Sequence, residues 1–108
     1  MDSTRAGKGV VTKKGDPMKH FTYFDGKVQS LEIRAASGRA TVGAIEPGRY
    51  TFSTSSEEHI VIVEGAMKVK LPGSDWQLIQ KGSELVVPRD VSFDIDAPAD
   101  VSYICYYR

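Results

Sequence analysis

Several side chains in this sequence could bind a charged or flat organic ligand. A guanidinium grips an oxyanion through a planar fork of N–H donors, so Arg39 and Arg89 are candidates for holding an anion. Strand alternation places Tyr50, Phe52 and Thr54 on one face of a single strand. There they either line a cavity, with rings and a hydroxyl for a ligand, or fill the core. For each arginine the alternative is a solvated surface charge.

The residues that commonly bind zinc or form covalent intermediates do not make a recognisable motif here. His20, His59 and the single cysteine, Cys105, lack the spacing of a zinc site. His59 is expected at the surface or at an interface, and Cys105, in an apolar segment, is expected to be buried as a small hydrophobic residue. The sequence also contains no phosphate-binding glycine loop and no serine or cysteine nucleophile motif.

Composition limits the classes of partner. The chain has 108 residues, which fits one domain, and 14 basic side chains balance 14 acidic ones. This balance gives no overall attraction to nucleic acid or to a membrane surface, so neither is expected as a partner. The apolar runs are far shorter than the roughly 20 residues that span a bilayer. A lone cysteine and the absence of an apolar leader favour the cytoplasm.

The pattern along the chain divides it into two parts. Residues 1–20 are polar and rich in glycine and lysine, which predicts an N-terminal extension. Residues 21–108 alternate apolar and polar positions between Gly, Pro and Asp turns, which predicts an all-β domain. Nine strands are expected, over residues 28–33, 39–45, 50–54, 60–63, 67–71, 76–79, 85–87, 93–95 and 101–107.

Two segments of the chain resemble the two sequence motifs of the cupin superfamily. Residues 48–65 contain a Gly, a strand, Glu58 and a second Gly, and residues 82–93 contain a Gly, five residues and a Pro. Metal-dependent cupins carry a His-x-His pair before the Glu and a His after the Pro. Phe52, Thr54 and Phe93 occupy those places here. The resemblance implies a single antiparallel cupin β-barrel of the jelly-roll type, without that metal site.

A narrower resemblance covers about residues 21–108. Six segments agree in order and spacing with the small single-domain cupins of the pyrimidine/purine nucleoside phosphorylase family: residues 23–30, 38–43, 47–54, 64–66, 71–77 and 103–107. Two positions depart from the pattern. Arg49 stands where an acidic residue is expected, and Asp90 stands where cupins often have a Gly.

The resemblance implies phosphorolysis of purine and pyrimidine nucleosides, with broad specificity. Inorganic phosphate would be the co-substrate, the products would be a free base and a pentose 1-phosphate, and no metal or organic cofactor would be needed. Phosphate attacks the anomeric carbon as the base leaves, through an oxocarbenium-like state. Such a reaction needs a cradle for phosphate, an acid for the departing base and polar groups for the sugar.

These requirements assign roles to particular residues. Glu58 occupies the place of the motif carboxylate that points into the barrel, so it is the candidate acid, and burial would raise its pKa. Arg39 is the candidate phosphate ligand and the second catalytic residue. The candidate substrate-binding residues are Tyr50, Phe52, Thr54, Arg89, Phe93 and Tyr103. The alternatives are a rim position for Glu58, and a core or dimer contact for Tyr103.

Two other functions remain open from the sequence. One is a cupin that binds a ligand without turning it over, since no known catalytic constellation is evident. The other is a metal-dependent cupin enzyme with unusual ligands. Whatever the function, a homodimer is expected, because a small barrel has exposed strand edges that are commonly covered by pairing.

Overall fold

The computed structural model describes residues 17–108, so residues 1–16 of the predicted extension lie outside the described residues. In the described part there are ten strands: β1 (His20–Tyr23), β2 (Val28–Ala35), β3 (Gly38–Ile45), β4 (Gly48–Ser53), β5 (Glu58–Glu64), β6 (Ala66–Lys70), β7 (Gln77–Gln80), β8 (Glu84–Val87), β9 (Ser92–Ala97) and β10 (Val101–Tyr107). The all-β prediction is confirmed. Each of the nine predicted segments matches one strand, and β1 was not predicted. This part of the chain has no helix able to cross a membrane.

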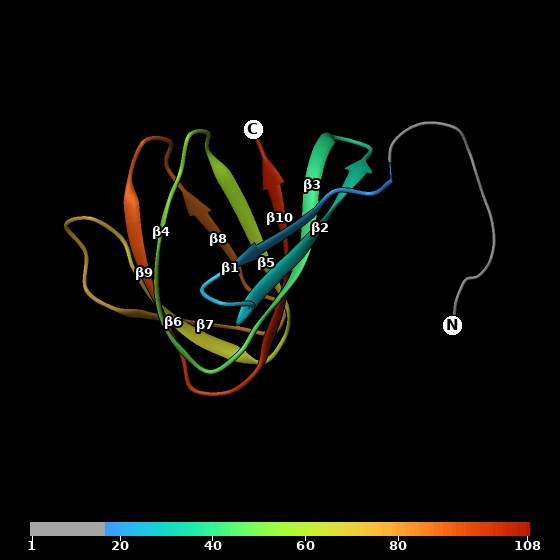
Figure 1. The fold of residues 1–108 in the computed structure, drawn as a ribbon. Helices are drawn as coiled ribbons and strands as arrows, with labels where there is room; N and C mark the ends of the chain where they lie inside the picture. The colour runs from blue at the N-terminus through green and yellow to red at the C-terminus, as the bar shows by residue number, and fades with distance from the viewer. Residues whose placement is uncertain (1–16) are drawn as a thin grey trace.

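The strands form two antiparallel sheets that face each other, as expected for a jelly roll (Figure 1). One has six strands in the order β1-β2-β3-β10-β5-β8, and the other has four in the order β4-β9-β6-β7. Within the described residues, hydrogen-bonded strand pairs occur inside each sheet and not between the two sheets. The barrel is therefore two separate sheets rather than one closed cylinder.

The core lies between the sheets and follows from the alternation of the strands. Inward positions carry aliphatic and aromatic side chains, which pack well against a pleated surface. The buried cluster consists of Val28, Ile45, Tyr50, Ile60, Ile62, Met67, Val69, Ile79, Leu85, Val87, Phe93, Ile95, Ala97, Val101 and Cys105.

The register of the six-stranded sheet brings distant parts of the chain together. β10 lies between β3 and β5, so that Tyr107 is opposite Glu58 and Cys105 is opposite both Thr41 and Ile60. Since alternate residues of a strand share a face, the side chains of Cys105 and Tyr107 lie on the same face as Glu58. Arg39, two residues before Thr41, belongs to the same face. These polar residues meet at one end of the sheet.

Two backbone positions explain features of the cupin-like motifs. Asp90 has a φ of 60°, in the left-handed region that glycine favours and that aspartate tolerates. The residue that departs from the glycine pattern thus keeps the same backbone conformation. Gly65 has a φ of 89°, and a Cβ there would come within 2.5 Å of the Asp100 carbonyl oxygen. Both conformation and space therefore require a glycine at position 65.

Candidate active site

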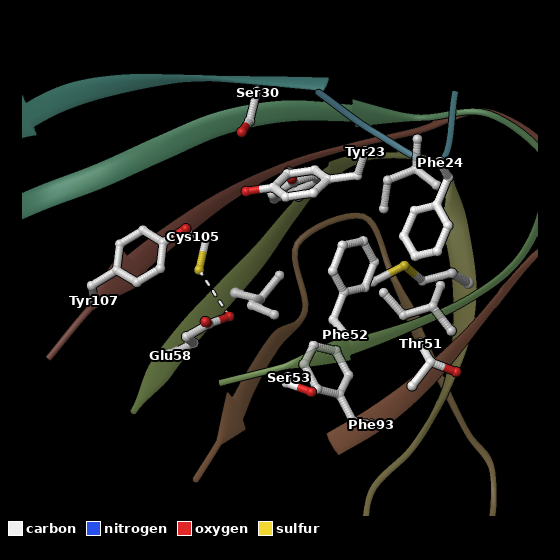
Figure 2. Close-up of a pocket in the computed structure, with 15 residues that line it drawn as sticks. Tyr23, Phe24, Ser30, Thr51, Phe52, Ser53, Glu58, Phe93, Cys105 and Tyr107 are labelled. Atoms are coloured by element: carbon white, nitrogen blue, oxygen red, sulfur yellow. Dashed lines mark hydrogen bonds between the residues drawn. The ribbon is translucent and has the colours of Figure 1, made fainter. Parts of the chain in front are cut away.

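A cavity of about 490 Å³ lies between the two sheets. Figure 2 shows the side chains around it, with aromatic rings at one end and polar groups at the other. Fifteen residues line it: Tyr23, Phe24, Ser30, Ile45, Thr51, Phe52, Ser53, Glu58, Ile60, Met67, Phe93, Ile95, Tyr103, Cys105 and Tyr107. Four of the predicted site residues are therefore brought together, namely Glu58, Phe52, Phe93 and Tyr103.

The aromatic end is organised around Phe52 of β4. Its ring centroid lies 5.3 Å from that of Phe24, 5.8 Å from that of Tyr23 and 6.1 Å from that of Phe93. Tyr23 is the last residue of β1, and Phe24 follows it in the β1–β2 turn with a φ of 54°, an uncommon conformation for a bulky residue. Both rings remain more than two-fifths exposed. This turn therefore forms an aromatic wall for the cavity that is still open to solvent.

The polar end contains a carboxyl group whose surroundings favour its neutral form. Glu58 begins β5, and the thiol of Cys105 donates a hydrogen bond to its Oε1 over 3.5 Å. Burial raises the pKa of Glu58, while the Cys105 hydrogen bond and the positive charge of Arg39 partly oppose that rise. A raised carboxyl pKa is the property expected of a proton donor working near neutral pH.

Neutral donors surround this carboxyl group. Burial raises the pKa of Tyr103 to about 12, and it also raises the pKa values of Cys105 and Tyr107 well above their ordinary range. The Tyr107 hydroxyl lies 3.1 Å from the hydroxyl oxygen of Thr41. At neutral pH these phenols and the thiol therefore keep their protons. They can donate hydrogen bonds to a ligand or to Glu58, and they are not ready nucleophiles.

Arg39 lies at the same end, next to Tyr107 rather than inside the cavity. Its guanidinium carbon is 4.0 Å from the centroid of the Tyr107 ring, and its Nε donates to Glu32 Oε1 over 2.7 Å. The Arg39 side chain is 47% exposed, whereas that of Glu32 is only 14% exposed. The hydrogen bond from Arg39 lowers the pKa of Glu32, so that carboxylate is charged at neutral pH. The contact with Glu32 uses Nε, which leaves the terminal nitrogens of the guanidinium for an anion.

Arg89 is not brought into this group. Its side chain is 72% exposed, and its Nε lies 3.5 Å from Asp90 Oδ2. It does not line the cavity. Its surroundings match the surface-charge alternative, and nothing in the geometry links it to Glu58.

Tyr50 and Thr54 are in the core and do not line the cavity, so of the two alternatives that the sequence left open for them the structure has the core position. The Tyr50 hydroxyl donates to the Glu46 carbonyl over 2.7 Å. The Thr54 hydroxyl donates to the Pro88 carbonyl over 2.7 Å and accepts from the Val91 amide at 3.1 Å. Both side chains are buried, and backbone groups use their hydroxyls. Their polar atoms stabilise the ends of β4 and the loop before β9.

Sequence reasoning missed several residues of the site. Ser30, Tyr23, Phe24, Cys105 and Tyr107 all line the cavity without having been assigned a role. For β10 a signal was available, because Tyr103, Cys105 and Tyr107 alternate and so share a face with one another. For Tyr23 and Phe24 the unusual backbone of the turn decides where the rings lie, and no periodicity reveals that.

Of the three positions that hold the metal-binding histidines of metal-dependent cupins, Phe52 and Phe93 line the cavity and Thr54 is buried beside it in the core. Among residues 17–108, no group of three or more His, Cys, Asp or Glu side chains could hold a metal ion. His59 lies on the outer side of β5, with its ring nitrogens 2.7 Å from Glu57 Oε2 and 3.2 Å from Glu84 Oε2.

Two facing antiparallel sheets around an internal cavity define a small cupin-like protein. The fold of this chain is shared with a putative ethanolamine utilisation protein from Salmonella typhimurium, at 14% identity and a TM-score of 0.64. The chain itself belongs to the pyrimidine/purine nucleoside phosphorylase family, whose model matches residues 18–107.

Relatives that carry this family name come from several pseudomonads. One from Pseudomonas entomophila is 45% identical over 87 residues, which is 80% of this chain and 93% of the relative. One from Pseudomonas aeruginosa is 44% identical, with 80% and 94% covered. A crystal structure of a protein of unknown function from Vibrio parahaemolyticus has a TM-score of 0.81 at 33% identity, covering 86% of this chain and all of that one.

Proposed function

We propose that this chain catalyses phosphorolysis of purine and pyrimidine nucleosides in the cavity between its sheets. Membership of the family supports the reaction class. The proposal rests mainly on Glu58, which lies in the wall of an aromatic cavity. Burial raises the pKa of this carboxyl group, and the positive charge of Arg39 is close enough to affect that pKa. The cavity volume of about 490 Å³ is in the range of small-molecule sites.

In the proposed reaction, Glu58 in its neutral form donates a proton to the departing base. An oxygen of hydrogen phosphate bonds to the anomeric carbon as the bond from that carbon to the base nitrogen breaks. The electron pair of the broken bond stays with the base, which takes the proton from Glu58. The proton of hydrogen phosphate then returns to the carboxylate, so the products are the neutral base and pentose 1-phosphate. General acid catalysis of this kind contributes about 10²–10⁴-fold.

The phosphate would bind to the terminal nitrogens of Arg39 at the edge of the cavity. A guanidinium forms charge-assisted, bidentate hydrogen bonds with such an anion. Glu32 already holds Nε, which fixes the plane of the guanidinium. The base would stack on the rings of Phe52 and Phe93. Those rings have no polar group to read the base edge, which supports tolerance of different bases.

The direct test is incubation with a mixture of nucleosides, with and without inorganic phosphate, followed by chromatography of bases and sugar phosphates. Phosphate-dependent release of free base together with pentose 1-phosphate is the expected result. Base release without phosphate would mean hydrolysis, and no release would favour a ligand-binding cupin.

The neutral donors Tyr103, Cys105 and Tyr107 favour this second function, because they suit an uncharged ligand that is held and not converted.

We also propose a cytoplasmic homodimer that uses neither metal nor organic cofactor. Support for a dimer comes from the outer face of the six-stranded sheet, where Leu31, Val42 and Val86 are each more than two-fifths exposed. Leu31 and Val42 are directly opposite each other in register, so they form an exposed apolar pair on neighbouring strands. Light scattering at micromolar concentration should give about twice the chain mass. A monomer mass would contradict the dimer.

A further inference from the structure

The polar end of the cavity contains a chain of hydrogen-bonding groups that crosses three strands. Thr41 of β3 and Tyr107 of β10 have their hydroxyl oxygens 3.1 Å apart. Cys105 and Tyr107 are two residues apart on β10 and share its inner face, and the Cys105 thiol donates to Glu58 Oε1 at 3.5 Å. Figure 2 shows Tyr107, Cys105 and Glu58 grouped at this end, with the thiol pointing toward the carboxyl group.

We propose that Tyr107 is a positioning residue that holds both catalytic groups, Arg39 through the face of its ring and Glu58 through the thiol of Cys105. This inference rests on the phosphorolysis proposed above. It assigns to one side chain the task of keeping the phosphate ligand and the proton donor in fixed relation.

Tyr107 holds Arg39 through the face of its ring. A cation above an aromatic face is attracted to the ring, and the guanidinium carbon of Arg39 lies 4.0 Å from the Tyr107 centroid. Glu32 holds Nε from another side. With the ring on one face and the carboxylate at one edge, the guanidinium has a defined plane, and bidentate binding of a phosphate depends on that plane.

Tyr107 holds Glu58 through its hydroxyl, by way of Cys105. Thr41 and Tyr107 share a hydrogen bond, and the Cys105 thiol donates to Glu58. We infer that the Tyr107 hydroxyl, on the same face of β10 as Cys105, donates to the thiol and completes the series, in which donors strengthen one another. Oε1 of Glu58 accepts the thiol hydrogen, so the proton of the neutral carboxyl group belongs on Oε2. The chain thereby selects the oxygen that donates to the base.

The ring and the hydroxyl can be tested separately with two variants. Tyr107→Phe keeps the ring face and removes the hydroxyl, so the phosphate concentration for half-saturation should stay unchanged. The carboxyl group loses support for its charged form, so the alkaline limb of the pH–kcat profile should move to higher pH. Tyr107→Leu removes both, and should in addition raise the half-saturating phosphate concentration about 2- to 5-fold, as expected for one exposed cation–π contact.

Two variants of Cys105 should shift the pKa of Glu58 in opposite directions and so serve as controls. Cys105→Ser places a stronger hydrogen-bond donor beside Glu58, which should lower the pKa of Glu58 and move the alkaline limb to lower pH. Cys105→Ala removes the donor and should move the limb to higher pH, as Tyr107→Phe does. The other titratable or charged groups that affect Glu58 are Arg39, Tyr103 and Tyr107, and they are the same in both cysteine variants.

A measurement without turnover separates this inference from the proposed reaction. Titration of the side-chain carboxyl carbon of Glu58 by ¹³C NMR reports its pKa directly, even if nucleosides are not cleaved. The inference is overturned if Cys105→Ser and Cys105→Ala shift that titration in the same direction. It is also overturned if Tyr107→Phe and Tyr107→Leu weaken phosphate saturation equally. Absence of phosphate-dependent base release by the wild-type protein would instead overturn the proposed function. Far-UV circular dichroism checks that each variant is folded.

Discussion

Gly43→Ala should destabilise the protein by forcing the Tyr103 ring out of its place in the cavity wall. A Cβ at position 43 would lie 2.5 Å from both Cζ and Oη of Tyr103, whereas ordinary van der Waals contact starts at 3.4 Å. The ring or strand β3 must therefore move by about 1 Å. Overpacking of this kind costs about 1–3 kcal/mol. For a domain of this size each kcal/mol lowers the Tm by roughly 4–8 °C.

Thermal unfolding measured by circular dichroism gives the stability change without reference to activity. The informative control is a double-mutant cycle with Tyr103→Ala, since that variant removes the ring that the new methyl group would meet. In the Tyr103→Ala background, Gly43→Ala should cost almost nothing, and the coupling should equal most of the single-variant loss. The same loss in both backgrounds would refute the steric explanation and point to the strand backbone. Turnover of Gly43→Ala should also fall, by about 10²-fold if a 1 Å displacement reaches the substrate.

Three further predictions concern the chemistry. Glu58→Gln should lower turnover by about 10²-fold or more. Because burial raises the folded-state pKa of Glu58, the carboxylate destabilises the fold at neutral pH. The variant should therefore have a higher Tm than the wild type at pH 7, and the difference should vanish as the pH falls and the carboxyl group becomes protonated. Full activity of Glu58→Gln would contradict the acid role. Arg39→Ala should chiefly raise the phosphate concentration for half-saturation, with Arg39→Lys intermediate because it keeps the charge and loses the fork. An unchanged dependence on phosphate would place the anion elsewhere. Activity should survive EDTA, and loss of turnover that a divalent ion restores would show that the metal-free prediction is wrong.

The fold was largely predictable because its strands carry a local signal. Alternation and turn residues marked nine of the ten strands, and the motif spacing around Glu58 indicated the architecture. The exception, β1 (His20–Tyr23), is short, lies at a sheet edge and is mostly exposed, so it has little apolar alternation to detect. Its location depends on pairing with β2, and that pairing is a property of the folded chain.

The site was predictable only in part, because strand register and hydrogen bonding determine it. The shared face of Tyr50, Phe52 and Thr54 was foreseen, yet only Phe52 reaches the cavity. Tyr50 and Thr54 lie on the same face, but their hydroxyls donate to backbone carbonyls, and the sequence alone does not show that these carbonyls are nearby. The contact between Arg39 and Tyr107 joins residues from two strands that are distant in sequence, so it too depends on the register of β3 and β10.

The separation of the two sheets has a mechanical consequence. In the described residues, the walls of the cavity belong to two sheets that are each held by backbone hydrogen bonds between strands. Side-chain packing, the connecting loops and a few loop hydrogen bonds, such as Gly82 N–H to the Ile62 carbonyl, join the two sheets. A change in the width of the cavity therefore alters apolar contacts and breaks no strand pairing. Phe52 and Phe93 sit on one sheet, and Glu58 and Tyr107 sit on the other. If the proposed reaction takes place here, the gap between ring and carboxyl group is the dimension that would have to differ between a one-ring and a two-ring base, while each wall keeps its own geometry.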